Sequence, residues 1–198
     1  MLKARVLNLL VVEKKEPPMS LRLYCLALLH FFDQPRRILF VLAWVPTFLL
    51  SFGLYLQHMV GLEPCPMCIV QRYAMCLMVL VAFGFAWTHS KWAHRAGFLL
   101  YASLSFSGAY VAARQSWLQW YPPEVVSCGR DFYGMIETFP LKRAIPMIFR
   151  GGGDCSVVDW TFLGGSIANW SFIAFVGLGL IALFGTYRSL SHPSAKTT

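Results

Sequence analysis

Six cysteines are the residues of this sequence with the clearest chemical potential: Cys25, Cys65, Cys68, Cys76, Cys128 and Cys155. The motif Cys65-Pro-Met-Cys68 follows Glu63-Pro64, which breaks the chain, so we expect the motif at the N-terminus of a helix. The helix dipole and the unpaired N–H groups at such a position lower the pKa of a thiol. Because the thiolate is the nucleophile in disulfide exchange, this placement favours redox activity.

Arg72 shares the predicted helix face of this motif. Cys65, Cys68 and Arg72 are spaced i, i+3 and i+7, which places their side chains on one face. Arg72 is then about 6 Å of helix rise below Cys68. A guanidinium just inside an apolar span is costly, and it indicates a function such as holding a thiolate or hydrogen-bonding the carbonyl of an apolar acceptor. The alternative is that Arg72 only extends to the lipid head groups, but the shared face favours the functional interpretation.

The composition shows which elements must position these groups. Of the 198 residues, 57% are hydrophobic and 13% are charged, whereas a soluble domain has about 25% charged residues. This argues against a soluble enzyme and against nucleic-acid binding, although the net charge is +8. Four stretches approach the roughly 20 residues needed to cross a bilayer, at 38–57, 67–87, 96–113 and 167–187. We therefore predict an all-α membrane protein with a bundle of four transmembrane helices.

The distribution of Lys and Arg predicts the orientation of the spans. Eleven lie in the N-terminal segment, the link between spans two and three, and the C-terminal tail, whereas the two other loops hold four. Because Lys and Arg accumulate on the cytoplasmic side, both termini are predicted to be cytoplasmic. The extracytoplasmic loops are expected at about 58–66 and 115–166, the second long and partly mobile. The chain then divides into a cytoplasmic extension with an interfacial apolar run, the transmembrane domain and a cytoplasmic tail, at 1–35, 36–187 and 188–198.

This topology sorts the cysteines by compartment. Cys25 lies on the cytoplasmic side, where thiols stay reduced, and Cys76 lies within the second span, where a cysteine is usually an apolar filler. Neither is assigned a role. The motif and the loop cysteines Cys128 and Cys155 lie outside, so these four serve either redox chemistry or structural disulfides. The wide spacing of the loop pair fits zinc poorly, and Ile69 stands where c-type haem attachment needs a histidine.

Two further patterns concern packing. Pro46 falls within the first span, where we expect a kink and a neighbouring group that satisfies the carbonyl it leaves without a donor. Aromatic residues flank the long loop, as is typical of a membrane interface, and we expect them to be anchors and not ligand contacts. They are Trp117, Trp120, Tyr121 and Trp160.

Over about residues 38–187 the chain resembles the disulfide bond formation protein B (DsbB) family, the quinone-reducing membrane partners of DsbA. The matching segments are Glu63-Pro-Cys-Pro-Met-Cys-Ile-Val-Gln-Arg72, Gln119-Trp-Tyr-Pro122, and Gly153-Asp-Cys155 followed by Trp160. No segment is specific alone, but together with four spans and a long outer loop they are highly specific. Some members carry a histidine at the position of Gln115, so this chain departs from that pattern.

The resemblance implies a quinone-dependent protein-disulfide oxidoreductase of the bacterial inner membrane, with catalytic residues Cys65, Cys68, Cys128 and Cys155. A periplasmic DsbA-like thiol oxidase would attack the Cys128–Cys155 disulfide at Cys128, and the Cys65–Cys68 pair would re-oxidise the loop pair. The electrons would pass to ubiquinone, or to menaquinone, held near Arg72. The resemblance implies no metal.

Two other functions remain open from the sequence. The chain could be a related oxidase that serves a dedicated partner, or a four-span scaffold in which both cysteine pairs are structural disulfides. A vitamin-K-epoxide-reductase-like enzyme also couples a Cys-x-x-Cys motif to a quinone. Its second cysteine pair normally precedes the motif, which is the reverse of the order here.

Overall fold

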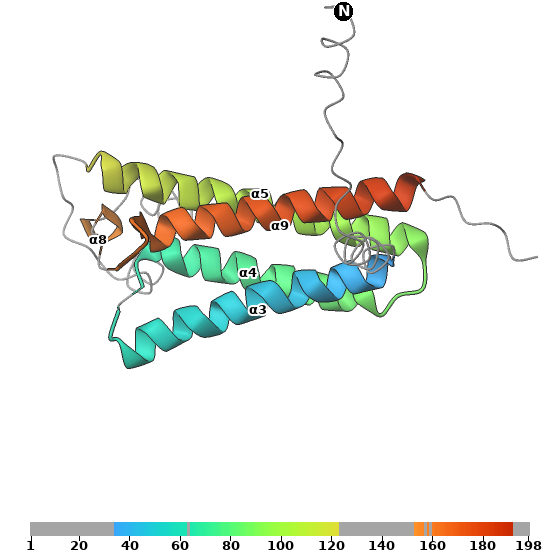
Figure 1. Cartoon of the computed structure of the whole chain (residues 1–198), viewed down its shortest axis with the longest axis horizontal. Helices are drawn as coiled ribbons and strands as arrows, with labels where there is room; N and C mark the ends of the chain where they lie inside the picture. Colours follow the sequence, from blue (N-terminus) through green and yellow to red (C-terminus); the bar gives the residue numbers. More distant parts are fainter. Residues whose placement is uncertain (1–33, 63, 123–152, 157, 159, 192–198) are drawn as a thin grey trace, which may run out of the picture. The chain divides into compact units, whose positions relative to one another are not determined.

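The computed structural model describes residues 34–62, 64–122, 153–156, 158 and 160–191. Within them, four helices are long and apolar enough to cross a membrane, which confirms the predicted all-α, four-span fold (Figure 1). They are α3 (Pro35–Met59), α4 (Pro66–Ala86), α5 (Lys91–Trp120) and α9 (Ile167–Ser191). A short helix and an antiparallel hairpin precede α9: α8 (Gly153–Ser156), β1 (Thr161–Phe162) and β2 (Gly165–Ser166).

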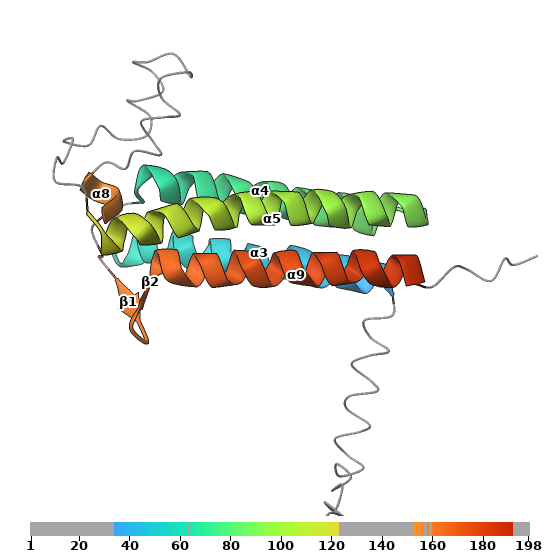
Figure 2. The ribbon, with the colours of Figure 1, turned by 90° about the horizontal axis from the view of Figure 1, so that it is seen from above.

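Each long helix packs against the next long helix in the chain. Helix α3 packs on α4, α4 on α5 and α5 on α9, whereas α3 and α9 meet over a smaller contact. Figure 2 shows α8 and the hairpin at one end of the bundle, beside the beginnings of α4 and α9. The beginning of α3, the α4–α5 link and the end of α9 lie at the opposite end (Figure 1). The cysteine motif, at the beginning of α4, therefore shares its end of the bundle with α8.

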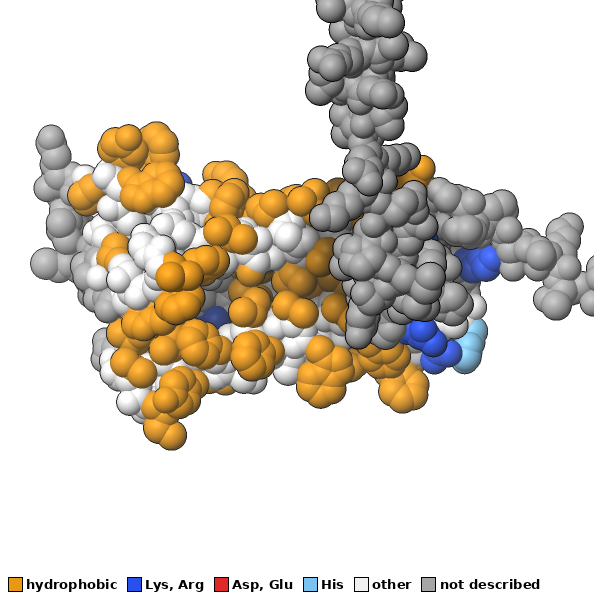
Figure 3. Space-filling view, in the orientation of Figure 1, with side chains coloured by type: hydrophobic (Ala, Val, Ile, Leu, Met, Phe, Trp, Pro, Cys, Tyr) orange, Lys and Arg blue, Asp and Glu red, His pale blue; other side chains and the backbone are white. Residues whose placement is uncertain are grey.

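The outward-facing side chains of the bundle are largely apolar. Phe48 on α3 is 73% exposed, and Leu80 on α4 and Tyr110 on α5 are each 67% exposed. In Figure 3, apolar side chains cover much of the described face, and most visible Lys and Arg lie at the end that carries the α4–α5 link. Soluble proteins rarely expose an apolar surface of this extent, so the described surface is suited to a lipid environment.

Helix α5 is longer than the sequence predicted, since it begins five residues before and ends seven residues after the stretch 96–113. The predicted span ended at the charged residues Arg95 and Arg114. A helix can continue through charged residues where their side chains have hydrogen-bond partners. Arg95 donates from Nε to Ser189 Oγ at 3.2 Å and from Nη2 to the Ser189 carbonyl at 2.6 Å, in the last turn of α9. Arg36 similarly donates to the carbonyl of Ala86, the last residue of α4. Both arginines satisfy carbonyl groups that helix C-termini leave without donors.

Pro46 lies inside α3 and is satisfied by a neighbouring helix, as expected. Proline has no N–H, so the carbonyl of Leu42 loses its usual donor four residues on. The hydroxyl of Tyr101, on α5, donates to that carbonyl at 2.7 Å. Tyr101 and Leu42 are fully buried, so this hydrogen bond joins α3 to α5 where water cannot substitute for it.

Helices α5 and α9 approach closely because a glycine of each helix packs against an aromatic ring of the other. A Cβ atom at Gly108 would lie 2.4 Å from the ring of Phe175, and one at Gly185 would lie 2.7 Å from the ring of Phe98. Ser105 adds a hydrogen bond of 2.6 Å to the Phe175 carbonyl. Small residues of this kind are the usual means by which membrane helices pack.

Candidate functional site

The Cys-x-x-Cys motif begins helix α4, where the sequence predicted it. Cys65 is the N-cap residue and Pro66 follows in the first turn, where the missing N–H of proline costs nothing. Cys65 Sγ accepts a hydrogen bond from the Cys68 backbone N–H at 3.4 Å. The two sulfurs lie 2.9 Å apart. A disulfide bond of about 2.05 Å therefore closes with less than about 1 Å of movement, so the pair can interconvert between dithiol and disulfide without rebuilding the helix end.

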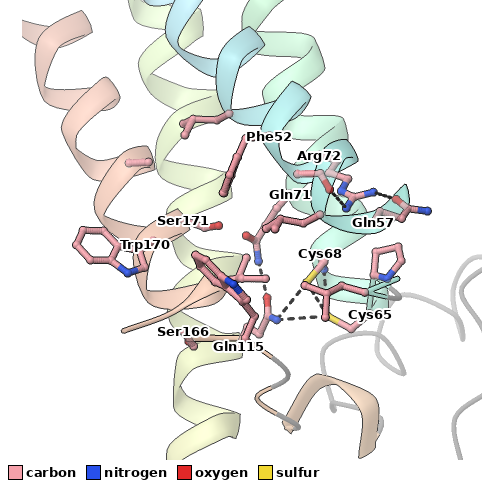
Figure 4. A pocket seen from close by; sticks show the side chains of 18 of the residues that line it. Phe52, Gln57, Cys65, Cys68, Gln71, Arg72, Gln115, Ser166, Trp170 and Ser171 are labelled. Atoms are coloured by element: carbon pink, nitrogen blue, oxygen red, sulfur yellow. Dashed lines mark hydrogen bonds between the residues drawn. The ribbon is translucent and has the colours of Figure 1, made fainter. Parts of the chain in front are cut away.

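Two buried glutamines connect α5 to this pair. Gln115 donates from Nε2 to Cys65 Sγ at 3.3 Å and to Cys68 Sγ at 3.2 Å. Its Oε1 accepts a hydrogen bond of 2.7 Å from Gln71 Nε2, which lies on α4. Both glutamine side chains are 4% exposed. Figure 4 shows the chain of contacts from Gln71 through Gln115 to the two sulfurs.

Cys155 also packs against the motif, next to Cys65. Helix α8 carries it and packs on α5. The Cys155 side chain is fully buried in a cluster with Cys65, Met67, Val111 and Leu118. The structure thus brings together three of the four predicted catalytic cysteines. Cys128 lies outside the described residues, so its pairing with Cys155 stays a prediction.

The environment of Cys65 differs from the one we expected at a helix N-terminus. Hydrogen bonds with the side chains of Cys155 and Cys68, together with burial, raise the pKa of the Cys65 thiol. The helix dipole acts in the opposite direction. The expectation of a lowered pKa is therefore wrong for Cys65.

Arg72 is anchored to α3 by two hydrogen bonds. Its Nη1 donates to Gln57 Oε1, and its Nη2 donates to the Gly53 carbonyl at 3.3 Å. Gln57 and Gly53 are one turn apart on α3, so the guanidinium spans two successive positions of that helix. A guanidinium has five N–H donors, and these two contacts leave others for a ligand.

A cavity of about 570 Å³ lies beside the motif and receives both motif sulfurs and Arg72. Its walls come from α3, α4, α5, the hairpin region and α9, and Cys155 is not part of them. Most lining residues are apolar, among them Phe48, Leu49, Phe52 and Met75. The other polar lining residues include Gln119. The rest are labelled in Figure 4: Gln57, Gln71, Gln115, Ser166 and Ser171. This combination of apolar walls and a few convergent polar groups is typical of a site for a small, mainly apolar ligand.

Aromatic rings follow one another from α3 to α9 along this cavity. Trp160 contacts Phe52 edge-on at a centroid distance of 6.3 Å and stacks on Phe162 at 6.1 Å. Phe162 in turn lies 6.1 Å from Trp170 on α9, and its carbonyl accepts a hydrogen bond from Trp170 Nε1. All four rings line the cavity. The expectation that Trp160 is only an interface anchor is therefore incomplete, because it also forms part of the cavity wall.

The sequence comparisons identify the family to which this site belongs. The family described as "Disulfide bond formation protein DsbB" matches residues 35–185. The chain belongs to the DsbB family. "Disulfide bond formation protein B" of Polaromonas naphthalenivorans (strain CJ2) is 65% identical over 155 residues, which is 78% of this chain and 93% of that protein. The protein of the same name from Albidiferax ferrireducens is 62% identical over 160 residues, covering 81% and 92% of the two chains.

Membership of the DsbB family confirms the resemblance stated from the sequence. The chain is a multi-pass membrane protein of disulfide bond formation, with disulfide oxidoreductase activity. No group of three or more His, Cys, Asp and Glu side chains suited to a metal occurs among the described residues.

Three features of the site were not found by sequence reasoning. The contact of Cys155 with Cys65 was not predicted, because it depends on how the loop folds back. Gln115 was noted only as a departure from a histidine, and no role was predicted for Gln57 or for Gln71. A usable signal existed, since polar side chains within apolar spans are expensive and often functional, as Gln57 and Gln71 are in α3 and α4.

Proposed function

We propose that this DsbB-family protein re-oxidises a DsbA-like thiol oxidase in the periplasm and passes the electrons to a membrane quinone, ubiquinone or menaquinone. One observation carries the proposal: the Cys65–Cys68 pair contacts Cys155 through Cys65 and also lines the apolar cavity. A dithiol in this position can exchange with a loop cysteine and still reach an acceptor dissolved in lipid.

The thiol half of the reaction is a series of disulfide exchanges. A thiolate of the reduced partner attacks the Cys128–Cys155 disulfide at Cys128 and forms a mixed disulfide. The partner's second thiolate then attacks the partner sulfur of this mixed disulfide, so that the partner leaves with its own disulfide and Cys128 is released. The loop pair is left as two thiols. Cys155 next attacks Cys65, so that a Cys155–Cys65 bond forms and Cys68 leaves as a thiolate; Cys128 then attacks Cys155 and restores the loop disulfide. Each step forms one S–S bond and breaks one, and the contact of Cys155 with Cys65 supports this order.

The acceptor half requires a site for a flat, mainly apolar molecule with polar carbonyl groups, and the cavity fits these requirements. Its apolar walls suit a quinone ring and tail, and the donors of Arg72 suit a carbonyl oxygen. When bound, a quinone takes up the two electrons and two protons that the Cys65–Cys68 dithiol loses on forming its disulfide. Arg72 would hold the acceptor, and the aromatic wall around Trp160 would orient it and exclude water.

The charges support one orientation in the membrane. We place both termini in the cytoplasm, the protein in the inner membrane and the redox cysteines on the periplasmic side. The bundle end opposite the motif carries several basic residues in its helix turns, which supports this orientation by the positive-inside rule. They are Arg36, Lys91, Arg95 and Arg188. Labelling intact cells with a membrane-impermeant thiol reagent tests it, because reduced Cys68 should be reachable only from outside.

Quinone reduction by the purified full chain, with reduced DsbA as electron donor, tests the function itself. We expect Cys65→Ser to abolish quinone reduction and to leave the loop pair reduced in the presence of DsbA, as measured by thiol trapping. Cys76→Ser is the matched control, because Cys76 is exposed on α4 and away from the cavity. It should turn over at the wild-type rate.

Two results would overturn the proposal. If the loop pair stays oxidised in Cys65→Ser, the order of the relay is wrong. If the wild-type protein never shows alkylatable thiols during substrate oxidation and does not respond to quinone, the chain is a scaffold whose disulfides are structural.

A further inference from the structure

We propose that Gln115 is the hydrogen-bond donor that stabilises the thiolate of the Cys65–Cys68 pair, and that Gln71 is the positioning residue that fixes its orientation. The inference deepens the proposed function and takes its catalytic meaning from it. It assigns a role to two side chains that carry no charge and that the sequence motif alone does not reveal.

The geometry fixes which end of the Gln115 amide faces the sulfurs. Gln71 donates to Gln115 Oε1 at 2.7 Å, so the oxygen end is occupied and the nitrogen end points to the motif. The Gln115 NH₂ group has two hydrogens, and two sulfurs lie within reach, Cys65 Sγ at 3.3 Å and Cys68 Sγ at 3.2 Å. Every hydrogen of this NH₂ group therefore has a sulfur as its acceptor.

Burial makes these contacts strong. Gln71 and Gln115 are both 4% exposed, so water does not compete for the sulfurs from their side. A hydrogen bond to a charged group is stronger than one between neutral groups, and more so in surroundings of low polarity. A disulfide sulfur is a weak acceptor, whereas a thiolate is a strong one, so Gln115 acts mainly on the reduced, ionised state.

That state is the one the reaction passes through. When Cys155 attacks Cys65, the Cys65–Cys68 bond breaks and its electron pair leaves on Cys68 as a thiolate. A leaving thiol departs faster when its thiolate is more stable, and Gln115 donates directly to that sulfur. Arg72 is the charged group on the same helix face and is held by Gln57 and Gly53 of α3.

Neither glutamine can take up a proton in the physiological range. The stabilisation that they supply is therefore the same at every pH, and the two protons of the dithiol must leave with the acceptor or to water. An ionisable side chain at position 115 would instead make the reactivity of the pair depend on its own protonation.

The test follows the alkylation of Cys68 by iodoacetamide in the reduced, full-length protein, with mass spectrometry to read that residue alone, as a function of pH. Gln115→Leu removes the donor, and Gln115→Glu keeps the shape but replaces the donor with an acceptor. A hydrogen bond to a charged group is worth about 1.5–3 kcal/mol, so Gln115→Leu should move the pH midpoint of Cys68 alkylation upward by about 1 to 2. Gln115→Glu should move it upward by at least as much, because an ionised carboxylate also repels the thiolate. Gln71→Leu, which leaves the donor in place but unfixed, should move it upward by less.

Ser107→Ala is the control for this alkylation. Ser107 lies on α5, is exposed, donates to the Ser103 carbonyl and is not part of the cavity wall. The variant should leave the Cys68 midpoint unchanged. The inference is overturned if Gln115→Leu and Gln115→Glu keep the wild-type midpoint, or if Ser107→Ala moves it as far as they do.

Alkylation needs neither quinone nor partner protein, so the two proposals fail separately. A wild-type protein that does not reduce quinone, but whose Gln115 variants shift the midpoint, refutes the proposed function and supports the inference. A protein that reduces quinone, but whose Gln115 variants show no shift, does the reverse.

Discussion

Replacing Tyr101 by phenylalanine should loosen the join between α3 and α5 by removing one oxygen atom. The hydroxyl donates at 2.7 Å to the Leu42 carbonyl, to which Pro46 cannot donate because proline has no N–H. Both partners are fully buried, so the carbonyl is left without a donor in the variant. A buried unsatisfied group costs about 1–3 kcal/mol, but hydrogen bonds between membrane helices average only about 0.6 kcal/mol, with a maximum near 1.7. We expect Tyr101→Phe to lower the free energy of unfolding by about 1–1.5 kcal/mol.

In a Pro46→Ala background, Tyr101→Phe should have a smaller effect. Alanine restores an N–H group at position 46, which donates to the Leu42 carbonyl within α3. The Tyr101 hydroxyl then becomes one of two donors, so Tyr101→Phe should cost less than about 0.5 kcal/mol in this background. The coupling energy of the double-mutant cycle is expected to be about 1 kcal/mol.

Reversible unfolding in mixed micelles with increasing denaturing detergent measures all four corners of this cycle. Tyr55→Phe is the control for the chemical change, because Tyr55 is on α3 and 56% exposed, and it should leave stability unchanged. An equal loss from Tyr101→Phe in the wild-type and Pro46→Ala backgrounds would mean that the hydroxyl does not replace the missing N–H.

Two further predictions concern the site. Arg72→Lys keeps the charge but loses the planar group that reaches both Gln57 and Gly53, so the KM for quinone should rise about 10- to 100-fold. Exchange between DsbA and the loop pair, measured by thiol trapping, should keep its wild-type rate. An unchanged KM contradicts a role in holding the acceptor. Cys155→Ala removes the leading cause of the raised pKa of Cys65, so the pH midpoint of Cys65 alkylation, read by mass spectrometry, should fall. A midpoint that stays or rises would show that Cys155 does not act on Cys65.

The parts of this fold that depend on local patterns were predictable from the sequence, and those that depend on tertiary contacts were not. Long apolar stretches and the break at Pro64 were enough for four spans and for a motif at the beginning of α4. The full length of α5 was not, because Arg95 ends an apolar stretch but finds its partner in Ser189 of α9. Likewise, nothing in the spacing of Gln71 and Gln115 shows that they meet, since 44 residues separate them.

The Cys155 contact explains why the position of the helix start matters for the chemistry. Cys65 is the N-cap of α4 and belongs both to the buried cluster with Cys155 and to the cavity wall. A motif one turn deeper, about 5.4 Å further along the axis, would sit beside Arg72 but out of reach of a cysteine carried by α8 at the bundle end. A motif one turn earlier would meet Cys155 but lose the cavity. The prolines that flank Cys65 fix where the helix begins, and they thereby keep a single dithiol next to both Cys155 and the cavity.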